Sequence, residues 1–143
     1  MNRSIVPTSG LALLLSLLAQ VPPAGAQPVT LTSGVYTSDQ AERGRASYAT
    51  NCLSCHAADL RGSSVSPTLR GVGFLFNWEG RSLAELYGTM ADNMPTDRPG
   101  SLDRETYADL LAYILQVNGY PPGDAGLTPD NQLLEQLVIV PPG

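Results

Sequence analysis

Apolar residues recur at helical spacing in two stretches of the chain. One stretch holds Leu83, Leu86, Tyr87 and Met90, and the other holds Tyr107, Leu110, Leu111 and Ile114. Both sets follow the spacing i, i+3, i+4, i+7, which places their side chains on one face of a helix. We therefore predict one helix that follows Ser82 and is ended by Pro95. A second is predicted over about 103–116 and is stopped by Asn118-Gly119 and then Pro121-Pro122.

A further helix is predicted ahead of these two. Thr37 and Gln40 stand at capping-box spacing before a stretch without proline, which indicates a helix over about 38–51. Gly44 lies inside it, where a glycine costs roughly 1 kcal/mol relative to alanine unless another segment packs against the bare backbone. Gly44 and Tyr48 share one helix face, so they indicate either a close helix crossing or a merely tolerated glycine.

The remaining segments lack a sustained period. Residues 27–36 are expected to form an extended lead-in, and residues 57–81, rich in Gly, Ser and Pro, a long ordered loop. Phe74, Leu75, Phe76 and Trp78 lie inside that loop, and such a cluster indicates a loop that wraps around something. A short helix is expected near 130–137. The chain therefore has the pattern of one all-α domain with three to five helices.

The N-terminal residues follow the pattern of an export signal. Arg3 supplies a positive charge, Gly10–Ala19 is a short apolar run, and Ala24-Gly25-Ala26 is a cleavage sequence of the A-x-A type. We expect residues 1–26 to be removed and residues 27–143 to form the mature domain in the periplasm. The alternative is an uncleaved anchor, although the apolar run is about half of the roughly 20 residues that span a bilayer. After cleavage we expect no stable membrane insertion.

Charge narrows the range of partners. The chain has 8 basic and 13 acidic residues, and all the basic ones are arginines. Without Arg3, the mature domain has a net charge of about −6. This balance argues against nucleic acid and anionic lipid as partners. It favours proteins with a basic docking surface, or serves only to keep the protein soluble.

The stretch "NCLSCH" contains both cysteines and the single histidine of the chain: Cys52, Cys55 and His56. A thioredoxin-like dithiol would need a βαβ setting, whereas the flanking pattern here is helix and loop. A zinc site would need a fourth ligand, and no further Cys or His is present. C-x-x-C-H is also the attachment sequence of c-type haem, a use that engages all three residues. We therefore predict one covalent haem c, with thioether bonds from Cys52 and Cys55 and an axial bond to iron from His56.

The sixth position on iron is filled by methionine, is filled by another weak ligand or stays empty, and the methionines left in the mature chain are Met90 and Met94. They lie four residues apart, so spacing alone does not choose between them. Met90 belongs to the apolar stripe of its helix, where methionine usually serves packing. Met94 directly precedes Pro95, which favours an extended backbone outside the helix. We predict Met94 as the iron ligand.

These residues resemble the class I monohaem cytochromes c, and more closely the small cytochromes and cytochrome domains associated with alcohol dehydrogenases that use pyrroloquinoline quinone. The resemblance covers about residues 36–137. It depends on four stretches in order: "RGRASYATNCLSCH", "SPTLRGVGFLFNWEGRSLAELY", "NMPTDRPGSL" and "YADLLAYILQVNGYPPG". It implies the cytochrome c fold, with the helices wrapped around one haem.

The resemblance also implies roles for single residues. Gly44 and Tyr48 would cross the C-terminal helix at Leu110 and Tyr113. The cofactor-binding set it implies adds Pro67, whose carbonyl would accept the His56 Nδ1–H, and Leu69, which would line the haem pocket. Trp78 and Arg81 are candidates for hydrogen bonds to a haem propionate. Alternatively, Trp78 is a buried loop aromatic and Arg81 a solvated surface charge.

A haem held by His56 and Met94 has no free coordination position, so the sequence predicts an electron carrier and not an enzyme. The resemblance implies electrons received from a quinoprotein alcohol dehydrogenase and passed toward a terminal oxidase. One alternative is a haem protein whose methionine is displaced by a gas or by peroxide. Another is a permanent subunit of a dehydrogenase complex, with the apolar end "LVIVPPG" as a contact strip unless it packs on its own domain.

Overall fold

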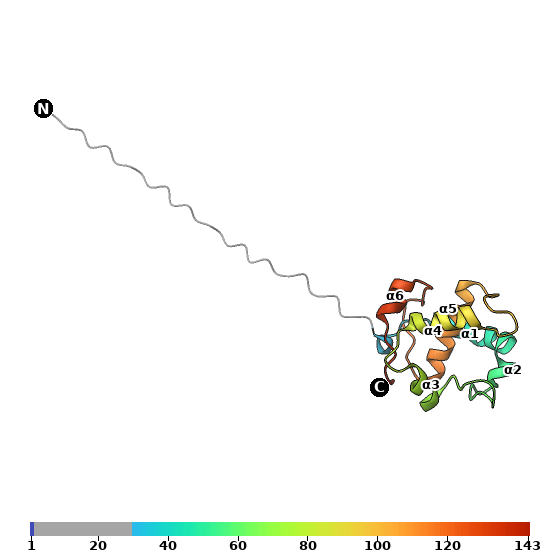
Figure 1. The fold of residues 1–143 in the computed structure, drawn as a ribbon. Helices are drawn as coiled ribbons and strands as arrows, with labels where there is room; N and C mark the ends of the chain where they lie inside the picture. Colours follow the sequence, from blue (N-terminus) through green and yellow to red (C-terminus); the bar gives the residue numbers. More distant parts are fainter. Residues whose placement is uncertain (2–29) are drawn as a thin grey trace.

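The structure is a computed structural model that describes Met1 and residues 30–143. Apart from Met1, the segment 1–26 expected to be an export signal lies outside the described residues. The described part contains a short 3-10 helix, Leu31–Ser33, and six α-helices (Figure 1): α1 Ser38–Asn51, α2 Leu53–His56, α3 Gly71–Trp78, α4 Leu83–Asn93, α5 Arg104–Val117 and α6 Asn131–Gln136. The all-α class is confirmed. The six α-helices are one more than the expected maximum of five, and two of them, α2 and α3, are short.

The crossing of α1 and α5 is the centre of the domain, as Figure 1 shows. A Cβ atom at Gly44 of α1 would lie 1.9 Å from the carbonyl oxygen of Asp109 and 2.9 Å from the Tyr113 Cβ on α5. Only glycine allows the two backbones to come this close. The rings of Tyr48 and Tyr113 meet beside it, with centroids 5.5 Å apart. The predicted close crossing is confirmed, and the atoms nearest to a Cβ at Gly44 belong to Asp109 and Tyr113.

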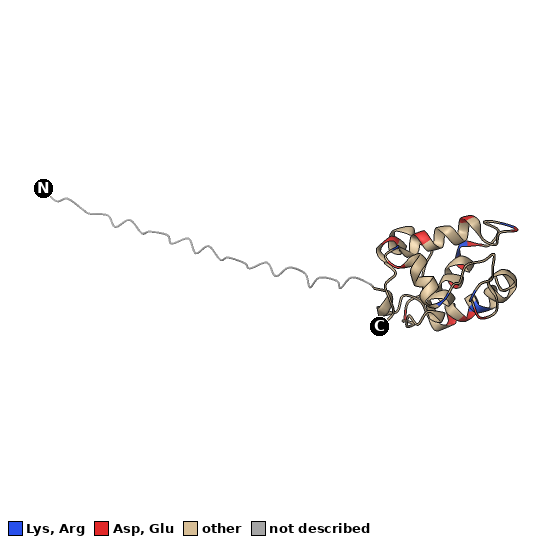
Figure 2. Ribbon diagram, turned by 60° about the horizontal axis from the view of Figure 1, so that its bottom comes forward, with Lys and Arg blue, Asp and Glu red and all other residues tan. Residues whose placement is uncertain are grey.

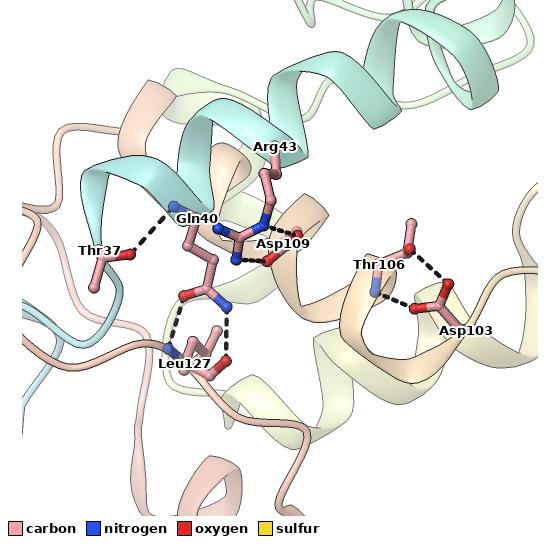
Figure 3. Close-up of polar contacts among 7 residues, drawn as sticks. All are labelled: Thr37, Gln40, Arg43, Asp103, Thr106, Asp109 and Leu127. Atoms are coloured by element: carbon pink, nitrogen blue, oxygen red, sulfur yellow. Dashed lines mark hydrogen bonds and ion pairs between the residues drawn. The ribbon is translucent and has the colours of Figure 1, made fainter.

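Polar contacts fix the N-terminal half of α1 to the rest of the fold (Figure 3). The Thr37 hydroxyl accepts the backbone N–H of Gln40 at 3.2 Å, as an N-cap does. The Gln40 side chain does not complete a capping box. Instead it pairs with the backbone of Leu127 through two hydrogen bonds of 2.7 Å each. Arg43 donates two hydrogen bonds to the carboxylate of Asp109, at 2.8 and 2.9 Å. The C-terminal loop and α5 are thus both held to one helix.

The C-terminal tail packs on its own domain. Ile139 accepts the N–H of Gly80 at 2.8 Å and donates to the carbonyl of Arg81 at 2.9 Å, and Leu83 donates to Leu137 at 2.8 Å. Leu137 and Ile139 are fully buried, and Val138 and Val140 between and after them are exposed. This alternation buries Leu137 and Ile139 of the apolar end "LVIVPPG" in the core. The tail therefore packs on its own domain, which is one of the two alternatives given for it above.

The prediction of a loop over the whole of residues 57–81 is wrong for residues 71–78, which form α3. Two glycines at the start of this segment obscured the helical pattern, and Gly73 in fact lies close to the Thr68 side chain. Phe74 is fully buried and Trp78, four residues later, is half-buried, so these two aromatics share the inner face. Phe76 is 89% exposed and belongs to the outer face, so only part of the apolar cluster faces inward.

Two global features follow from the described part of the chain. None of its helices combines the length and apolar character that crossing a bilayer requires. Acidic side chains outnumber basic ones, and Figure 2 shows them spread over several helices rather than gathered on one. The negative charge therefore acts through the field of the whole domain.

The N-cap of α5 leads to a prediction about pH. Hydrogen bonds from the Thr106 backbone and then from its hydroxyl, at 2.7 and 2.9 Å, hold the pKa of the Asp103 carboxyl below its usual value (Figure 3). The ionised group thus stabilises the fold above the pKa of the unfolded chain, about 4, and this contribution is lost as the pH falls through the lowered pKa. Asp103→Asn keeps an acceptor but no charge. We expect denaturant titrations to show a stability deficit of this variant at pH 7 that shrinks in acid. A deficit that is independent of pH would contradict this.

Candidate functional site

A cavity of about 690 Å³ opens between α1, α2, α3, α4 and α5. Its volume is in the range of protein ligand pockets. The inner wall is apolar, and its aliphatic members come from α4, α5 and two loops: Leu69, Leu86, Leu102, Leu110 and Ile114. All eight residues proposed from the sequence as cofactor or iron contacts line this one space: Cys52, Cys55, His56, Pro67, Leu69, Trp78, Arg81 and Met94. Met90, the other candidate methionine, lines it too.

The two cysteines and the histidine lie where α1 ends and α2 begins. Cys52 closes α1 by donating its N–H to Tyr48, and it accepts the N–H groups of Cys55 and His56 at 3.1 and 2.9 Å. This tight turn brings the side chains of Cys52, Cys55 and His56, which lie within five positions of the sequence, to the same cavity. Neither cysteine is in a disulfide. Burial raises the pKa of the Cys52 thiol to about 11, so at neutral pH it is a protonated thiol, unlike the thiolate of a dithiol oxidoreductase.

His56 is buried, and its ring orientation is set by a loop residue. Its Nδ1 lies 2.9 Å from the carbonyl oxygen of Pro67. A carbonyl oxygen only accepts, so Nδ1 carries a proton, and the tautomer of the neutral ring has its lone pair on Nε2. No buried side-chain nitrogen or oxygen in the described part of the chain lacks a partner, and Nε2 has no hydrogen bond there. Nε2 is therefore open to space and available as a metal ligand.

The loop that carries Pro67 and Leu69 is shaped by two residues. Gly62 adopts φ +75°, and a Cβ there would lie 2.3 Å from the Ser66 carbonyl oxygen and 2.7 Å from that of Pro67. Asn118, at the end of α5, donates to the carbonyl of Leu69 at 2.9 Å and accepts the N–H of Gly71 at 2.8 Å. Asn118 was expected only as a helix stop. A polar side chain that bridges the start of α3 to α5 has no signature in local spacing.

The two methionines differ in backbone setting. Met90 lies within α4, whereas Met94 is its C-cap residue, with an extended backbone at φ −121° and ψ 150°. The carbonyl of Met94 accepts a hydrogen bond of 2.6 Å from the Tyr107 hydroxyl of α5. Tyr107 was expected only as a core residue of its helix. Both methionines line the cavity, but only Met94 lies on a segment that is free of helical constraint.

Trp78 and Arg81 lie next to each other at the cavity. The Arg81 guanidinium carbon is 4.4 Å from the centroid of the Trp78 ring, a cation–π arrangement. The same guanidinium pairs with Glu85 at 3.0 Å. The indole N–H of Trp78 has no hydrogen-bond acceptor among the described residues. Arg81 is thus a paired and partly exposed cation, and Trp78 keeps a donor for an anionic group of a ligand.

The comparisons with known proteins add to this geometry. Residues 39–114, more than half of the chain, match the family model described as cytochrome C oxidase, cbb3-type, subunit III. The chain belongs to this cytochrome c family. A search of curated proteins found no match for the cytochrome. A solved chain of the sulfane dehydrogenase SoxCD from Paracoccus pantotrophus matches it with a TM-score of 0.53 and 22% identity, over 75% of this chain. The cytochrome spans 60% of that chain, and the likeness at this identity is one of fold.

The residues of the cytochrome fit a covalently bound haem, as its family implies. The cavity holds two thiols that are not in a disulfide, an imidazole whose Nε2 has no hydrogen bond, and two thioether side chains among apolar walls. The described residues contain no group of three His, Cys, Asp or Glu side chains able to hold a metal ion, so this donor set suits a porphyrin-bound iron better than zinc. The cytochrome is an electron-transfer protein.

Proposed function

We propose that His56 and Met94 are the axial ligands of a single haem c and that Cys52 and Cys55 hold it through thioether bonds. When bound, haem supplies a centre that gains and loses one electron without a change of ligands. The observation that supports this assignment best is the His56 Nδ1 contact with Pro67, which fixes the tautomer with Nε2 free. With haem bound, Trp78 would donate its indole N–H to a propionate, and Arg81 would add positive charge beside it.

We further propose that the cytochrome carries electrons in the periplasm from a quinoprotein alcohol dehydrogenase toward a terminal oxidase. The export pattern of residues 1–26 supports the compartment. The four sequence stretches quoted above support the dehydrogenase. The family name, which is that of an oxidase subunit, supports an oxidase as acceptor. The acidic balance favours short-lived encounters with partners that present a basic surface.

A permanent place in a dehydrogenase complex is the second candidate. It is favoured by the match to a chain of SoxCD, a sulfane dehydrogenase. Electron transfer would then occur inside a lasting interface rather than in passing encounters. Size-exclusion chromatography of material from its native source separates the two: a free shuttle elutes at the size of one domain, and a subunit elutes with its complex.

Absorption spectroscopy and mass measurement of denatured holoprotein test the haem assignment. We expect the mass of the chain from residue 27 plus one haem, and a spectrum that shows a methionine-to-iron charge-transfer band when oxidised. The double variant Cys52→Ala/Cys55→Ala should release its pigment into acid acetone, because no covalent bond remains, while the wild type retains it. Haem that is extractable from the wild type, or a mass that includes residues 1–26, would contradict the corresponding part of the proposal.

A further inference from the structure

The loop that follows Met94 is tied to the opposite wall of the cavity by one hydrogen bond. The Arg98 Nη2 donates to the Asn51 Oδ1 at 2.6 Å. Asn51 is the last residue of α1 and directly precedes Cys52, so it belongs to the wall that carries the cysteines and His56. Arg98 lies four residues after Met94, on the other wall. Both residues line the cavity.

This contact lies at the solvent edge of the cavity. Asn51 is half-buried, and Arg98 is exposed. Within residues 30–143, no other side-chain hydrogen bond or ion pair joins residues 94–101 to residues 50–57. The second hydrogen bond of the Arg98 side chain goes to its neighbour Asp97 at 3.4 Å and stays within the loop. The Asn51 side chain is itself fixed, because its amide donates to the Ser47 carbonyl at 2.9 Å.

Residues 94–101, the Met94 loop, are therefore held at two places. On the inner side, the Met94 N–H donates to Met90 at 2.9 Å and its carbonyl accepts from Tyr107. On the outer side, the Arg98 N–H donates to the Pro95 carbonyl at 2.9 Å and forms a turn, which leaves only the side chain of Arg98 to reach across. The contact of Arg98 with Asn51 therefore adds a restraint on the outer side of the loop to the restraint at Met94 on its inner side.

We propose that Arg98 and Asn51 form a clasp that keeps the Met94 loop closed over the cavity. This inference depends on the proposed function, because it assigns Arg98 and Asn51 as positioning residues for Met94 as iron ligand. The clasp does not contribute a ligand. It lowers the fraction of molecules in which Met94 has moved away and an outside ligand can enter. The acceptor is a neutral amide, so the contact requires no change of protonation near neutral pH.

Imidazole added to the oxidised holocytochrome is the probe. It binds iron only when Met94 is displaced, so its apparent affinity reports the open fraction of the loop. We expect Arg98→Ala and Asn51→Ala each to raise this affinity by about three- to tenfold, which corresponds to the loss of one charge-assisted hydrogen bond near solvent. The double variant should show no further rise, because both substitutions break the same contact.

Two further variants make the result specific. Asn51→Asp keeps an acceptor for Arg98 and should bind imidazole no more tightly than the wild type. Arg45→Ala removes an exposed pair with Glu42 on the same helix, at 2.6 Å, and should leave the affinity unchanged. Single alanine variants within twofold of the wild type, or a double variant whose effect is the product of the two, would overturn the clasp. A wild type without the methionine-to-iron band would instead overturn the ligand assignment.

Discussion

Met94→Ala is expected to remove the sixth ligand while the haem stays attached, and so to change the redox properties of this cytochrome strongly. A soft thioether favours reduced iron, so its loss should lower the reduction potential by on the order of 0.1–0.2 V, part of the roughly 0.8 V that axial ligands span. The charge-transfer band of the oxidised protein should disappear, and the reduced variant should bind carbon monoxide. Potentiometry and absorption spectra measure these effects.

Met90→Ala is the matched control, since Met90 lines the same cavity four residues earlier. It lies inside α4 with its backbone fixed by the helix. We expect the band and the potential to be retained, with a loss of stability of about 1–3 kcal/mol for a half-buried thioether. If Met90→Ala opens the coordination site and Met94→Ala does not, the ligand assignment is reversed. Carbon monoxide binding by the reduced wild type would favour the gas-binding alternative.

Gly44→Ala is expected to destabilise the fold more than alanine at any other glycine within the described helices. The new Cβ would lie 1.9 Å from the Asp109 carbonyl oxygen and 2.5 Å from its carbon, both backbone atoms of α5. Overpacking costs about 1–3 kcal/mol even against movable side chains, and a backbone contact belongs at the upper end. The gain in helix propensity, about 1 kcal/mol, offsets part of this. We expect a net loss of roughly 2 kcal/mol in denaturant unfolding of the holoprotein.

Gly88→Ala provides the control within α4. Nothing lies within 4 Å of a Cβ built at this glycine, and its backbone is helical. Alanine should therefore be neutral or stabilise the protein by up to about 1 kcal/mol through helix propensity alone. If both variants gained stability, the close crossing of α1 and α5 would be contradicted, and Gly44 would be a tolerated glycine.

Local patterns were sufficient where the physical cause is local. The capping spacing at Thr37 predicted α1, and the periodic apolar stripes predicted α4 and α5, each to within one or two residues. At Ser82 the full capping box forms, with Glu85 bonded back to the Ser82 N–H. These signals work because a helix end needs hydrogen-bond partners within three residues of itself. The helix α3 was missed because the two glycines at its start obscure the local signal that a helix begins there.

The chemistry of this protein could be predicted from the order of its amino acids, because Cys52, Cys55 and His56 stand together in one short motif and few methionines remain to complete the set. How these groups are held could be learned only from the folded chain. Gly62 bends a loop so that Pro67 reaches His56, Tyr107 fixes the backbone of Met94, and Arg98 reaches Asn51 from 47 positions away. Such contacts depend on how the helices and loops pack in space. Residue spacing along the sequence does not indicate which distant residues will form them.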